Sequence, residues 1–258
     1  MALTNSVKNY YNNYNEDARL TRKSRLPEYL LTMEYIERYS FDGAKILEIG
    51  AGTGRYSIAL ADKGYDVTAV VPHNIDILKK KVKPKHKITI YEGNAVDLSF
   101  LDNETYDIVL LLGPMYHLFN NEDKHAAISE AIRVTKKGGV IYAAYCNNET
   151  RMYKMFYKKR VLGLLNSGEI NKEFHFKANS GMVFELYRKP EIDELMKDYN
   201  VTRLHFVGVD MLSYLHSNKL DRLSKKEFEE YMKYLHTICE RDDLTGFSIH
   251  MLDIFRKD

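Results

Sequence analysis

The stretch that decides the fold is Leu47-Glu48-Ile49-Gly50-Ala51-Gly52-Thr53-Gly54-Arg55. The apolar run at residues 45–49 is typical of a short buried strand, and it ends directly in the glycines. Residues 55–63 then have a helical pattern that Gly64 closes. Glycines at a strand-to-helix turn let the backbone approach a ligand, and the helix N-terminus offers unpaired N–H groups. We therefore predict a ligand site at this turn.

An acidic residue, Glu48, stands two positions before the first glycine of the turn. Its carboxylate would repel a pyrophosphate and attract an ammonium group. This feature favours a cofactor that carries an amino acid over a dinucleotide such as NAD.

Strands and helices alternate along the first part of the chain. Further strands are expected at residues 66–71, 87–91, 106–112 and 140–146, and helices at 24–39 (capped by Ser24), 75–82 and 124–134. Such alternation implies a parallel sheet covered on both faces. After residue 147 we expect a helix at 151–165, a β-hairpin with arms at 173–176 and 182–186, a helix at 190–199, a strand at 201–209, a helix at 224–239 (capped by Ser224) and a strand at 246–255.

With these motifs in order, residues 44–148 resemble a class I S-adenosylmethionine-dependent methyltransferase. The resemblance implies an α/β, Rossmann-like fold with a seven-stranded, mainly parallel sheet, an antiparallel final strand and a small helical and hairpin cap. We expect a single methyltransferase domain over residues 1–258. Its parts would be an N-terminal helical lid (1–40), a cofactor-binding core (41–148), a cap insertion (149–200), and closing strands and helix (201–258).

The resemblance also implies a cofactor, S-adenosylmethionine, with S-adenosylhomocysteine as its product. The residues that would hold its methionine part are Glu48, Gly50, Ala51, Gly52 and Gly54, with Glu48 placing the amino group. A glycine turn without a ligand, or a site for a different nucleotide, is the alternative.

The second strand departs from the family pattern at Val71. In dinucleotide folds an acid that binds the ribose follows the glycines by about 20 residues; the matching position here is Val71, since 71 − 52 = 19. Either Asn74, Asp76 or a main-chain group holds the ribose, or cofactor affinity is weakened. The lost hydrogen bonds could cost on the order of 1–3 kcal/mol. For Asp76, an exposed position on a helix is the alternative.

Two later segments complete the expected site. Asn94 and Ala95 resemble the family segment that contacts adenine, since an amide oxygen can accept and a backbone N–H can donate; an ordinary polar turn is the alternative. Leu112 and Gly113 would lie beside the cofactor. Tyr116 and His117 would face the sulfonium methyl, with His117 as candidate general base. A histidine that only hydrogen-bonds a local turn is the alternative.

The N-terminal segment and the cap are candidates for closing the site. In related methyltransferases a leading helix folds over the cofactor, so Tyr11 and Tyr14 are expected to pack on it and Arg19 to contact its carboxylate; a surface helix is the alternative. In the cap, the aromatic residues can line an apolar pocket. The cap's cations can attract an acidic substrate or RNA, or form a solvated face.

Composition narrows the classes of protein that fit. Lys and Arg number 38 and Asp and Glu 36, a balance that disfavours a dedicated nucleic-acid binder. The two cysteines, Cys146 and Cys239, have no metal-site spacing, so we expect no metal and a cytoplasmic protein. No apolar run suits a membrane span, so we expect no membrane partner. His205 and His250 are expected to be packed or hydrogen-bonded rather than catalytic.

We therefore expect methyl transfer by in-line displacement to an oxygen, nitrogen or carbon atom of a small molecule, by a monomer or homodimer. The sulfonium is an activated leaving group, so alignment supplies much of the rate. The alternatives are a methyltransferase acting on RNA or protein, and a cofactor-binding protein whose turnover is weakened or lost because of Val71.

Overall fold

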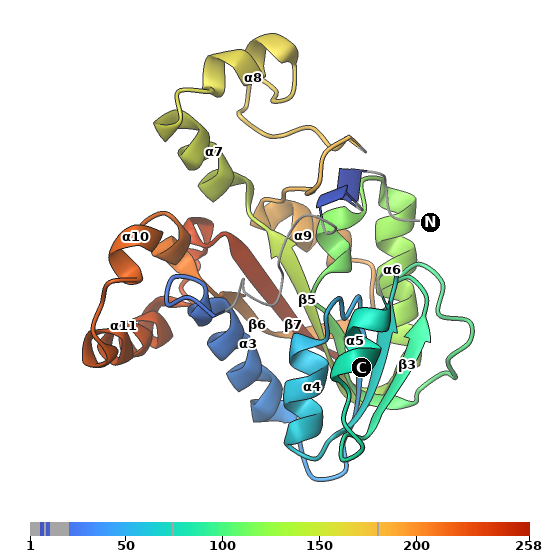
Figure 1. The fold of residues 1–258 in the computed structure, drawn as a ribbon. Helices are drawn as coiled ribbons and strands as arrows, with labels where there is room; N and C mark the ends of the chain where they lie inside the picture. Colours follow the sequence, from blue (N-terminus) through green and yellow to red (C-terminus); the bar gives the residue numbers. More distant parts are fainter. Residues whose placement is uncertain (1–5, 8, 11–20, 74, 180) are drawn as a thin grey trace.

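The computed structural model describes residues 6–7, 9–10, 21–73, 75–179 and 181–258. Its centre is a seven-stranded sheet in the order β3-β2-β1-β4-β5-β7-β6 (Figure 1). The strands are β1 Lys45–Ile49, β2 Asp66–Val71, β3 Ile88–Glu92, β4 Tyr106–Leu111, β5 Thr135–Cys146, β6 Val201–Gly208 and β7 His250–Lys257. Only β7 runs against its neighbours, β5 and β6. The predicted sheet and its antiparallel final strand are confirmed.

Helices cover both faces of the sheet because alternate strand residues are apolar on both sides. Leu47 and Val109 pack into one buried cluster with α6 (Asn121–Val134) and α9 (Lys189–Met196). On the opposite face, strand residues pack against α3 (Leu26–Tyr39), α4 (Arg55–Asp62) and α11 (Lys225–Ile238). The short elements are α5 Ile75–Lys81, α10 Ser217–Leu220, and the 3-10 helices η1 Pro114–His117, η2 Met211–Tyr214 and η3 Thr245–Phe247.

The topology fixes where a site can form. From β1 the chain runs outward through β2 to β3, and then returns to β4 on the other side of β1. Such a reversal of strand order opens a crevice outside the carboxyl ends of β1 and β4, where open α/β sheets bind ligands. Among the described residues, no helix is long and apolar enough to cross a bilayer.

Two predicted helix caps had different outcomes. Ser224 caps α11 as predicted, since its hydroxyl accepts from the Glu227 N–H at 3.2 Å and the Glu227 carboxylate accepts from the Ser224 N–H at 2.7 Å. Ser24 does not cap α3, which begins at Leu26 after Arg25. The Ser24 N–H instead donates to Asp221 at 2.9 Å, a contact 197 residues away that the local pattern could not indicate.

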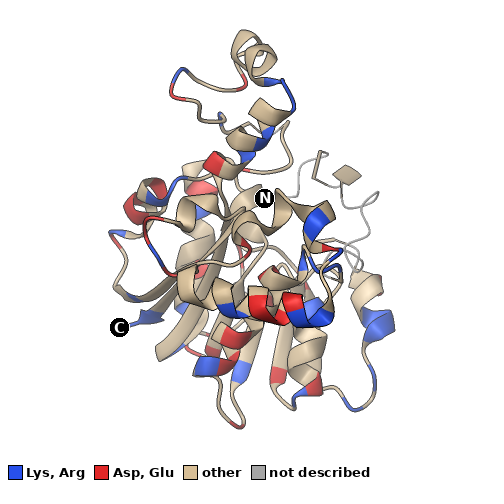
Figure 2. Cartoon of the chain, turned by 90° about the vertical axis from the view of Figure 1, so that its left-hand side faces the viewer, with Lys and Arg blue, Asp and Glu red and all other residues tan. Residues whose placement is uncertain are grey.

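The cap differs from its prediction. The single helix expected at residues 151–165 is two helices, α7 (Asn148–Tyr157) and α8 (Val161–Ser167), which stand away from the sheet in Figures 1 and 2. The break between them contains Lys159, whose φ is 54°. The predicted β-hairpin is wrong: the described part of residues 173–186 forms no strand. Phe176 and Leu186 pack instead against α7 and α8 in one buried cluster, and an isolated pair of strands is only marginally stable.

One substitution in the cap is expected to stabilise the protein. Gly163 lies inside α8, and a Cβ built there meets no atom within 4 Å. Glycine inside a helix costs about 0.5–1 kcal/mol relative to alanine. Gly163→Ala should therefore raise the free energy of unfolding by about that amount in urea denaturation. Gly168→Ala is the matched control and should lower it, because Gly168 ends α8 with φ 73°. A less stable Gly163→Ala would contradict the assignment of α8.

Candidate functional site

The glycine turn after β1 has a left-handed backbone at each of its three glycines. Gly50, Gly52 and Gly54 have φ values of 79°, 53° and 81°, in the left-handed region. The N–H groups of Gly50 and Ala51 both donate to the carbonyl of Val70, at 2.9 and 3.0 Å, which ties the turn to the end of β2. A Cβ on Gly54 would lie 2.1 Å from Cδ1 of Leu78. The chain therefore passes through a tight turn whose backbone favours glycine at all three positions.

Glu48 fixes the start of the helix that follows this turn. Its side chain is buried, and its carboxylate accepts hydrogen bonds from both the backbone N–H (2.9 Å) and the hydroxyl of Ser57. Ser57 lies in the first turn of α4. The acid therefore holds the N-terminus of α4 against β1. The predicted placing of a ligand amino group by Glu48 stays a prediction.

The end of β4 lies directly beside the glycine turn. A Cβ on Gly50 would come within 3.0 Å of the Pro114 ring, and one on Gly113 within 3.5 Å of the Gly50 carbonyl oxygen. Two motifs about 60 residues apart in the sequence thus meet at the crevice, as parallel-sheet topology predicts. Leu112 and Gly113 lie at this junction, where a ligand on the turn would reach them.

His117 is held by the cap. Its Nδ1 lies 2.8 Å from the carbonyl oxygen of Val183, and a carbonyl can only accept, so Nδ1 carries the proton. Burial lowers the pKa of His117 to about 4, and the hydrogen bond to Val183 opposes that only in part. The imidazole is therefore uncharged at neutral pH. The partner is not in a local turn, the alternative considered above, but 66 residues away.

Four aromatic rings meet at the carboxyl end of β4, and we call Tyr10, Tyr116, His117 and Phe184 the aromatic cluster. Phe184 lies edge-on to Tyr10 with ring centroids 5.3 Å apart, and its centroid is 5.5 Å from that of His117. Tyr116 packs against both His117 and Phe184, and its hydroxyl donates to the Leu112 carbonyl at 2.8 Å. The cluster joins the N-terminal segment, the end of β4 and the cap. Phe184 was not predicted as a site residue, because nothing in the local sequence distinguishes it from other cap aromatics.

The surroundings of the other predicted site residues say less about their roles. Tyr11, Tyr14, Arg19 and Asn74 lie outside the described residues. The Asn94 side-chain oxygen accepts from the N–H of Val96 at 2.9 Å, so it forms a local turn and retains one lone pair for another donor.

Val71 offers no side-chain acceptor at the end of β2. It is fully buried in a small apolar cluster with Ala51, Ala69 and Leu78. The surroundings of residue 71 are therefore apolar and suit the valine that stands in place of the expected acid.

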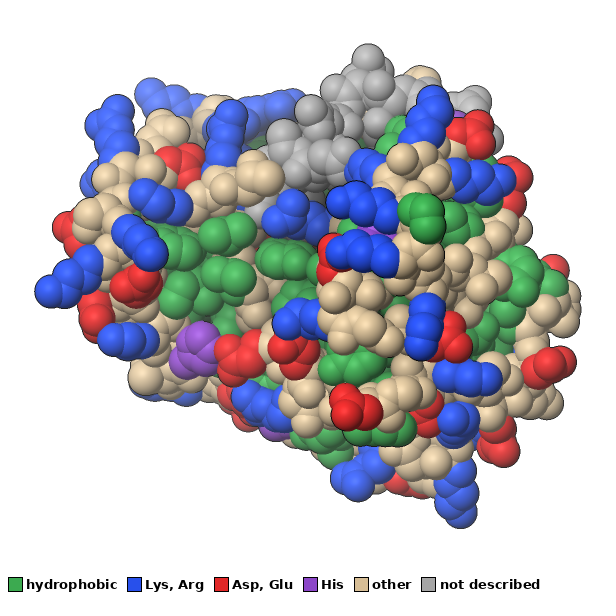
Figure 3. Space-filling view, turned by 60° about the horizontal axis from the view of Figure 1, so that its bottom comes forward, with side chains coloured by type: hydrophobic (Ala, Val, Ile, Leu, Met, Phe, Trp, Pro, Cys, Tyr) green, Lys and Arg blue, Asp and Glu red, His purple; other side chains and the backbone are tan. Residues whose placement is uncertain are grey.

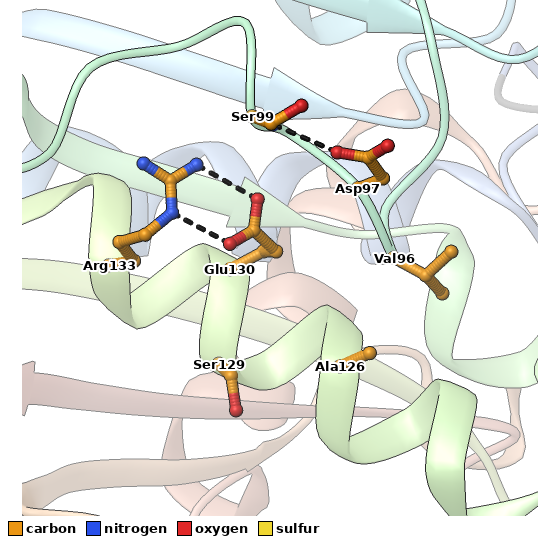
Figure 4. A pocket seen from close by; sticks show the side chains of 7 residues that line it. All are labelled: Val96, Asp97, Ser99, Ala126, Ser129, Glu130 and Arg133. Carbon is orange, nitrogen blue, oxygen red and sulfur yellow. Dashed lines mark hydrogen bonds and ion pairs between the residues drawn. The ribbon is translucent and has the colours of Figure 1, made fainter.

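A surface hollow of about 500 Å³ lies between α6 and the loop that follows β3 (Figure 4). Seven side chains line it: Val96, Asp97, Ser99, Ala126, Ser129, Glu130 and Arg133. Glu130 pairs with Arg133 at 2.7 Å and accepts from the Leu98 N–H, also at 2.7 Å, so these charges hold the loop against α6. None of the predicted site residues lines this hollow.

Three ionisable side chains, Glu28, Asp210 and His250, form a charged cluster at the start of β7. His250 Nδ1 lies 2.7 Å from Asp210 Oδ2 and 3.3 Å from Glu28 Oε2, and Tyr214 donates to Glu28 at 2.9 Å. Burial disfavours the imidazolium, but the two carboxylates favour it more strongly, so the pKa of His250 lies well above its usual value. The three groups are of types that can hold a metal ion. The contacts of these three groups are explained by a positively charged His250 that lies between the carboxylates of Asp210 and Glu28.

Both histidines that were expected to be structural are hydrogen-bonded. His250 has the partners just described, and His205 bonds the Tyr39 hydroxyl at 2.7 Å and Glu240 at 2.9 Å. This agrees with their prediction as packed residues.

The sheet order, the glycine turn and the adjoining end of β4 define the class I S-adenosylmethionine-dependent methyltransferase fold. Residues 46–139 match the family model of the methyltransferase domain, so this segment of the chain is a methyltransferase domain of that class. The resemblance stated from the sequence is thereby confirmed.

Relatives and solved structures agree with this class. The chain is 33% identical over 108 residues to a demethylmenaquinone methyltransferase of Renibacterium salmoninarum, covering 42% of this chain and 44% of that protein. It is 33% identical over 104 residues to a cypemycin N-terminal methyltransferase of Streptomyces, covering 39% and 41%. A possible histamine N-methyltransferase of Thermotoga maritima superposes with a TM-score of 0.58 at 19% identity, covering 98% of this chain and all of that one. The last likeness shows the fold. The chain matches about half the length, or less, of these two curated relatives.

Proposed function

We propose that the chain binds S-adenosylmethionine at the glycine turn and transfers its methyl group to a small molecule by in-line displacement. The observation that carries the proposal is the left-handed turn Gly50–Gly54, held by Val70 and placed against Pro114 at the switch point of the sheet. The residues present fit the cofactor: Glu48, Gly50, Ala51, Gly52 and Gly54 would hold its methionine part, Asn94 and Ala95 would contact its adenine, and Leu112 and Gly113 would lie beside it.

The cofactor supplies an activated methyl group, so the protein's task is alignment and exclusion of water. The aromatic cluster does both, because Tyr10 and Phe184 bring the N-terminal segment and the cap together over the end of β4. Its rings offer apolar surface for an acceptor.

We propose His117 as the base that takes the acceptor's proton. Its neutral form at physiological pH leaves Nε2 as the lone-pair nitrogen, while Nδ1 donates to Val183. A pKa near 4 makes it a weak base, which suits an acceptor whose proton becomes acidic only as the new bond forms. Tyr116 would orient the acceptor by ring contact.

A small-molecule acceptor is supported by the demethylmenaquinone methyltransferases among the relatives. The cypemycin N-terminal methyltransferase supports the alternative of a peptide or protein acceptor. An RNA acceptor is disfavoured by the net charge of +2, and acidic side chains lie among the basic ones on the face in Figure 3. We further propose one domain over residues 1–258, a monomer or homodimer, and a cytoplasmic location without a membrane partner.

Calorimetric titration with S-adenosylmethionine and S-adenosylhomocysteine tests the proposal directly. We expect both to bind, and saturation at 100 times Kd to stabilise the fold by about 2.7 kcal/mol in thermal unfolding. Absence of heat and of thermal stabilisation by either compound at millimolar concentration would refute cofactor binding. Binding without turnover of any acceptor would favour the alternative of a cofactor-binding protein.

Val71→Asp tests how the ribose is held. If Val71 were merely a missing ligand, restoring an acid should tighten cofactor binding. Because its side chain lies in an apolar cluster with Ala51 and Leu78, we expect a loss of about 1–3 kcal/mol in stability and no gain in affinity for S-adenosylhomocysteine. Val71→Ile is the control for volume. Tighter binding by Val71→Asp would show that the new carboxylate leaves the cluster and reaches the ribose.

A further inference from the structure

The first helix of the cap carries a stripe of unneutralised positive charge. Arg151, Lys154 and Lys158 lie at i, i+3 and i+7 and so share one face of α7 and its end, while Met152 and Met155 on another face pack into the cap. Residues 150–168 contain five Lys and Arg and no Asp or Glu. The acidic residue of α7, Glu149, lies in its first turn and pairs with Arg188.

Acidic partners are also missing from the rest of the described chain. Arg151 and Lys154 form no ion pair within the part of the chain that the structure describes, whereas Arg188, also in the cap, pairs with Glu149 at 2.5 Å. A further cation, Arg25 at the start of α3, stacks on the Tyr214 ring with its Cζ 3.3 Å from the ring centroid. Arg25 likewise lacks a carboxylate partner among the described residues.

The stripe begins at the carboxyl edge of the sheet. The Asn147 N–H donates to the Ile249 carbonyl at 2.8 Å, and the Thr150 hydroxyl donates to the Ser248 carbonyl at 3.1 Å, so α7 starts at the end of β5. Met152 and Met155 of α7 lie in one buried cluster, against which Tyr116 and Phe184 pack. The first helix of the cap therefore adjoins the aromatic cluster through Tyr116 and Phe184.

The three cations also lie near one another. Lys154 lies one turn after Arg151 on α7, and Arg25 stacks on Tyr214, whose ring centroid is 5.4 Å from that of His250, the residue of β7 that pairs with Cys146 just before α7. Burial, followed by the charges of Lys158, Arg151 and Arg25, lowers the pKa of Lys154. Burial likewise lowers the pKa of Arg151, although its side chain keeps contact with solvent. Like charges gathered on this surface repel one another, and an anion bound between them would relieve that repulsion.

We propose that the methyl acceptor carries an anionic group, a carboxylate or a phosphate, which Arg151, Lys154 and Arg25 bind while the rest of the molecule packs on the aromatic cluster. This inference rests on the proposed methyltransferase function and narrows its substrate class. Arg151 supplies a guanidinium fork that can bind a planar carboxylate through two hydrogen bonds. The apolar rings then require the acceptor's other end to be aromatic or aliphatic.

The test uses the full chain saturated with S-adenosylhomocysteine, titrated in a calorimeter with two matched probes at neutral pH. 3-Phenylpropionate has the apolar ring and the carboxylate, and 3-phenylpropanamide is its uncharged counterpart. We expect the carboxylate to bind about tenfold or more tightly than the amide, and the preference to weaken at high salt. Inorganic phosphate should compete with the carboxylate.

Variants test which cations cause the preference for the carboxylate probe. Arg151→Gln and Lys154→Gln should each abolish most of the preference for the carboxylate while leaving affinity for S-adenosylhomocysteine unchanged. Lys226→Gln, an exposed cation on α11 with no ion pair among the described residues, is the control and should keep the preference.

Four results would overturn the inference. The first two are equal binding of the two probes and no binding of either probe at millimolar concentration. The third is a preference for the carboxylate that survives both variants. The fourth is a loss of S-adenosylhomocysteine affinity in the variants, which would assign the cations to the cofactor's own carboxylate. If tRNA binds in a salt-sensitive way that depends on Arg151, the acceptor is RNA and not a small molecule. Failure of the proposed function is distinct, since S-adenosylhomocysteine itself would then not bind.

Discussion

His250→Leu is expected to destabilise the protein by about 3–5 kcal/mol in urea denaturation at neutral pH. The substitution removes the cation between Asp210, which is fully buried, and Glu28, which is 8% exposed. Asp210 keeps its hydrogen bonds from Ser248 and from the N–H of Ile249, but both carboxylates lose the positive charge of His250. The loss comes from the two buried carboxylates that remain, more than from the removed contacts.

The pH dependence provides an independent check. The folded-state pKa of His250 is raised above its ordinary value, so its stabilising contribution is complete below about pH 6.5 and is lost as pH rises through the raised pKa. The difference between wild type and His250→Leu should therefore shrink under alkaline conditions. His236→Leu is the matched control, because His236 pairs with Glu34 at the surface, and it should change stability little. Equal losses in both variants would contradict the argument.

Gly54→Ala is expected to cost about 2–4 kcal/mol of stability and to weaken S-adenosylhomocysteine binding at least about tenfold. The backbone at Gly54 has φ 81°, and a Cβ would lie 2.1 Å from the fully buried Leu78. Relief of that contact must move the turn, the Leu78 side chain or α5. Movement of the turn displaces the N-terminus of α4, which Gly54 precedes and where the ligand would lie.

Gly64→Ala separates backbone strain from damage to the site. Gly64 also has a positive φ, 94°, but a Cβ there meets nothing within 4 Å, and the residue follows the far end of α4. We expect it to lose stability through strain alone, about 1 kcal/mol, and to keep its ligand affinity. Calorimetry below the unfolding temperature of both variants compares them. Retained affinity in Gly54→Ala would show that the turn is not the binding site.

The core of the fold could be predicted from the sequence because its signals are local. Residues 45–49 and 66–71 are short apolar runs bounded by turn residues, and both form strands with the predicted limits. The cap could not be predicted in the same way. Residues 173–186 have the composition of a hairpin, but Phe176 and Leu186 gain more by packing on α7 and α8 than by pairing with each other.

The candidate site likewise combines features that the local sequence predicts with features that it does not. The glycine turn and the end of β4 are each recognisable in a window of ten residues, and the order of parallel strands brings them together. The contact between His117 and Val183 spans 66 residues, and the cluster of Glu28, Asp210 and His250 comes from three separate segments. No local pattern encodes such contacts, because they depend on how the cap and α3 pack on the finished sheet.

The cap leaves and re-enters the fold at a single point. The Tyr187 N–H donates to the Cys146 carbonyl at 2.8 Å, and the Asn148 N–H donates to the Tyr187 carbonyl at 3.0 Å, so the two ends of the insertion are bonded to each other where β5 stops. An insertion closed in this way can be lengthened, exchanged or grafted during evolution without shifting the register of any strand. Under the proposed function, acceptor choice can therefore diversify among descendants of this scaffold while the donor half stays constant.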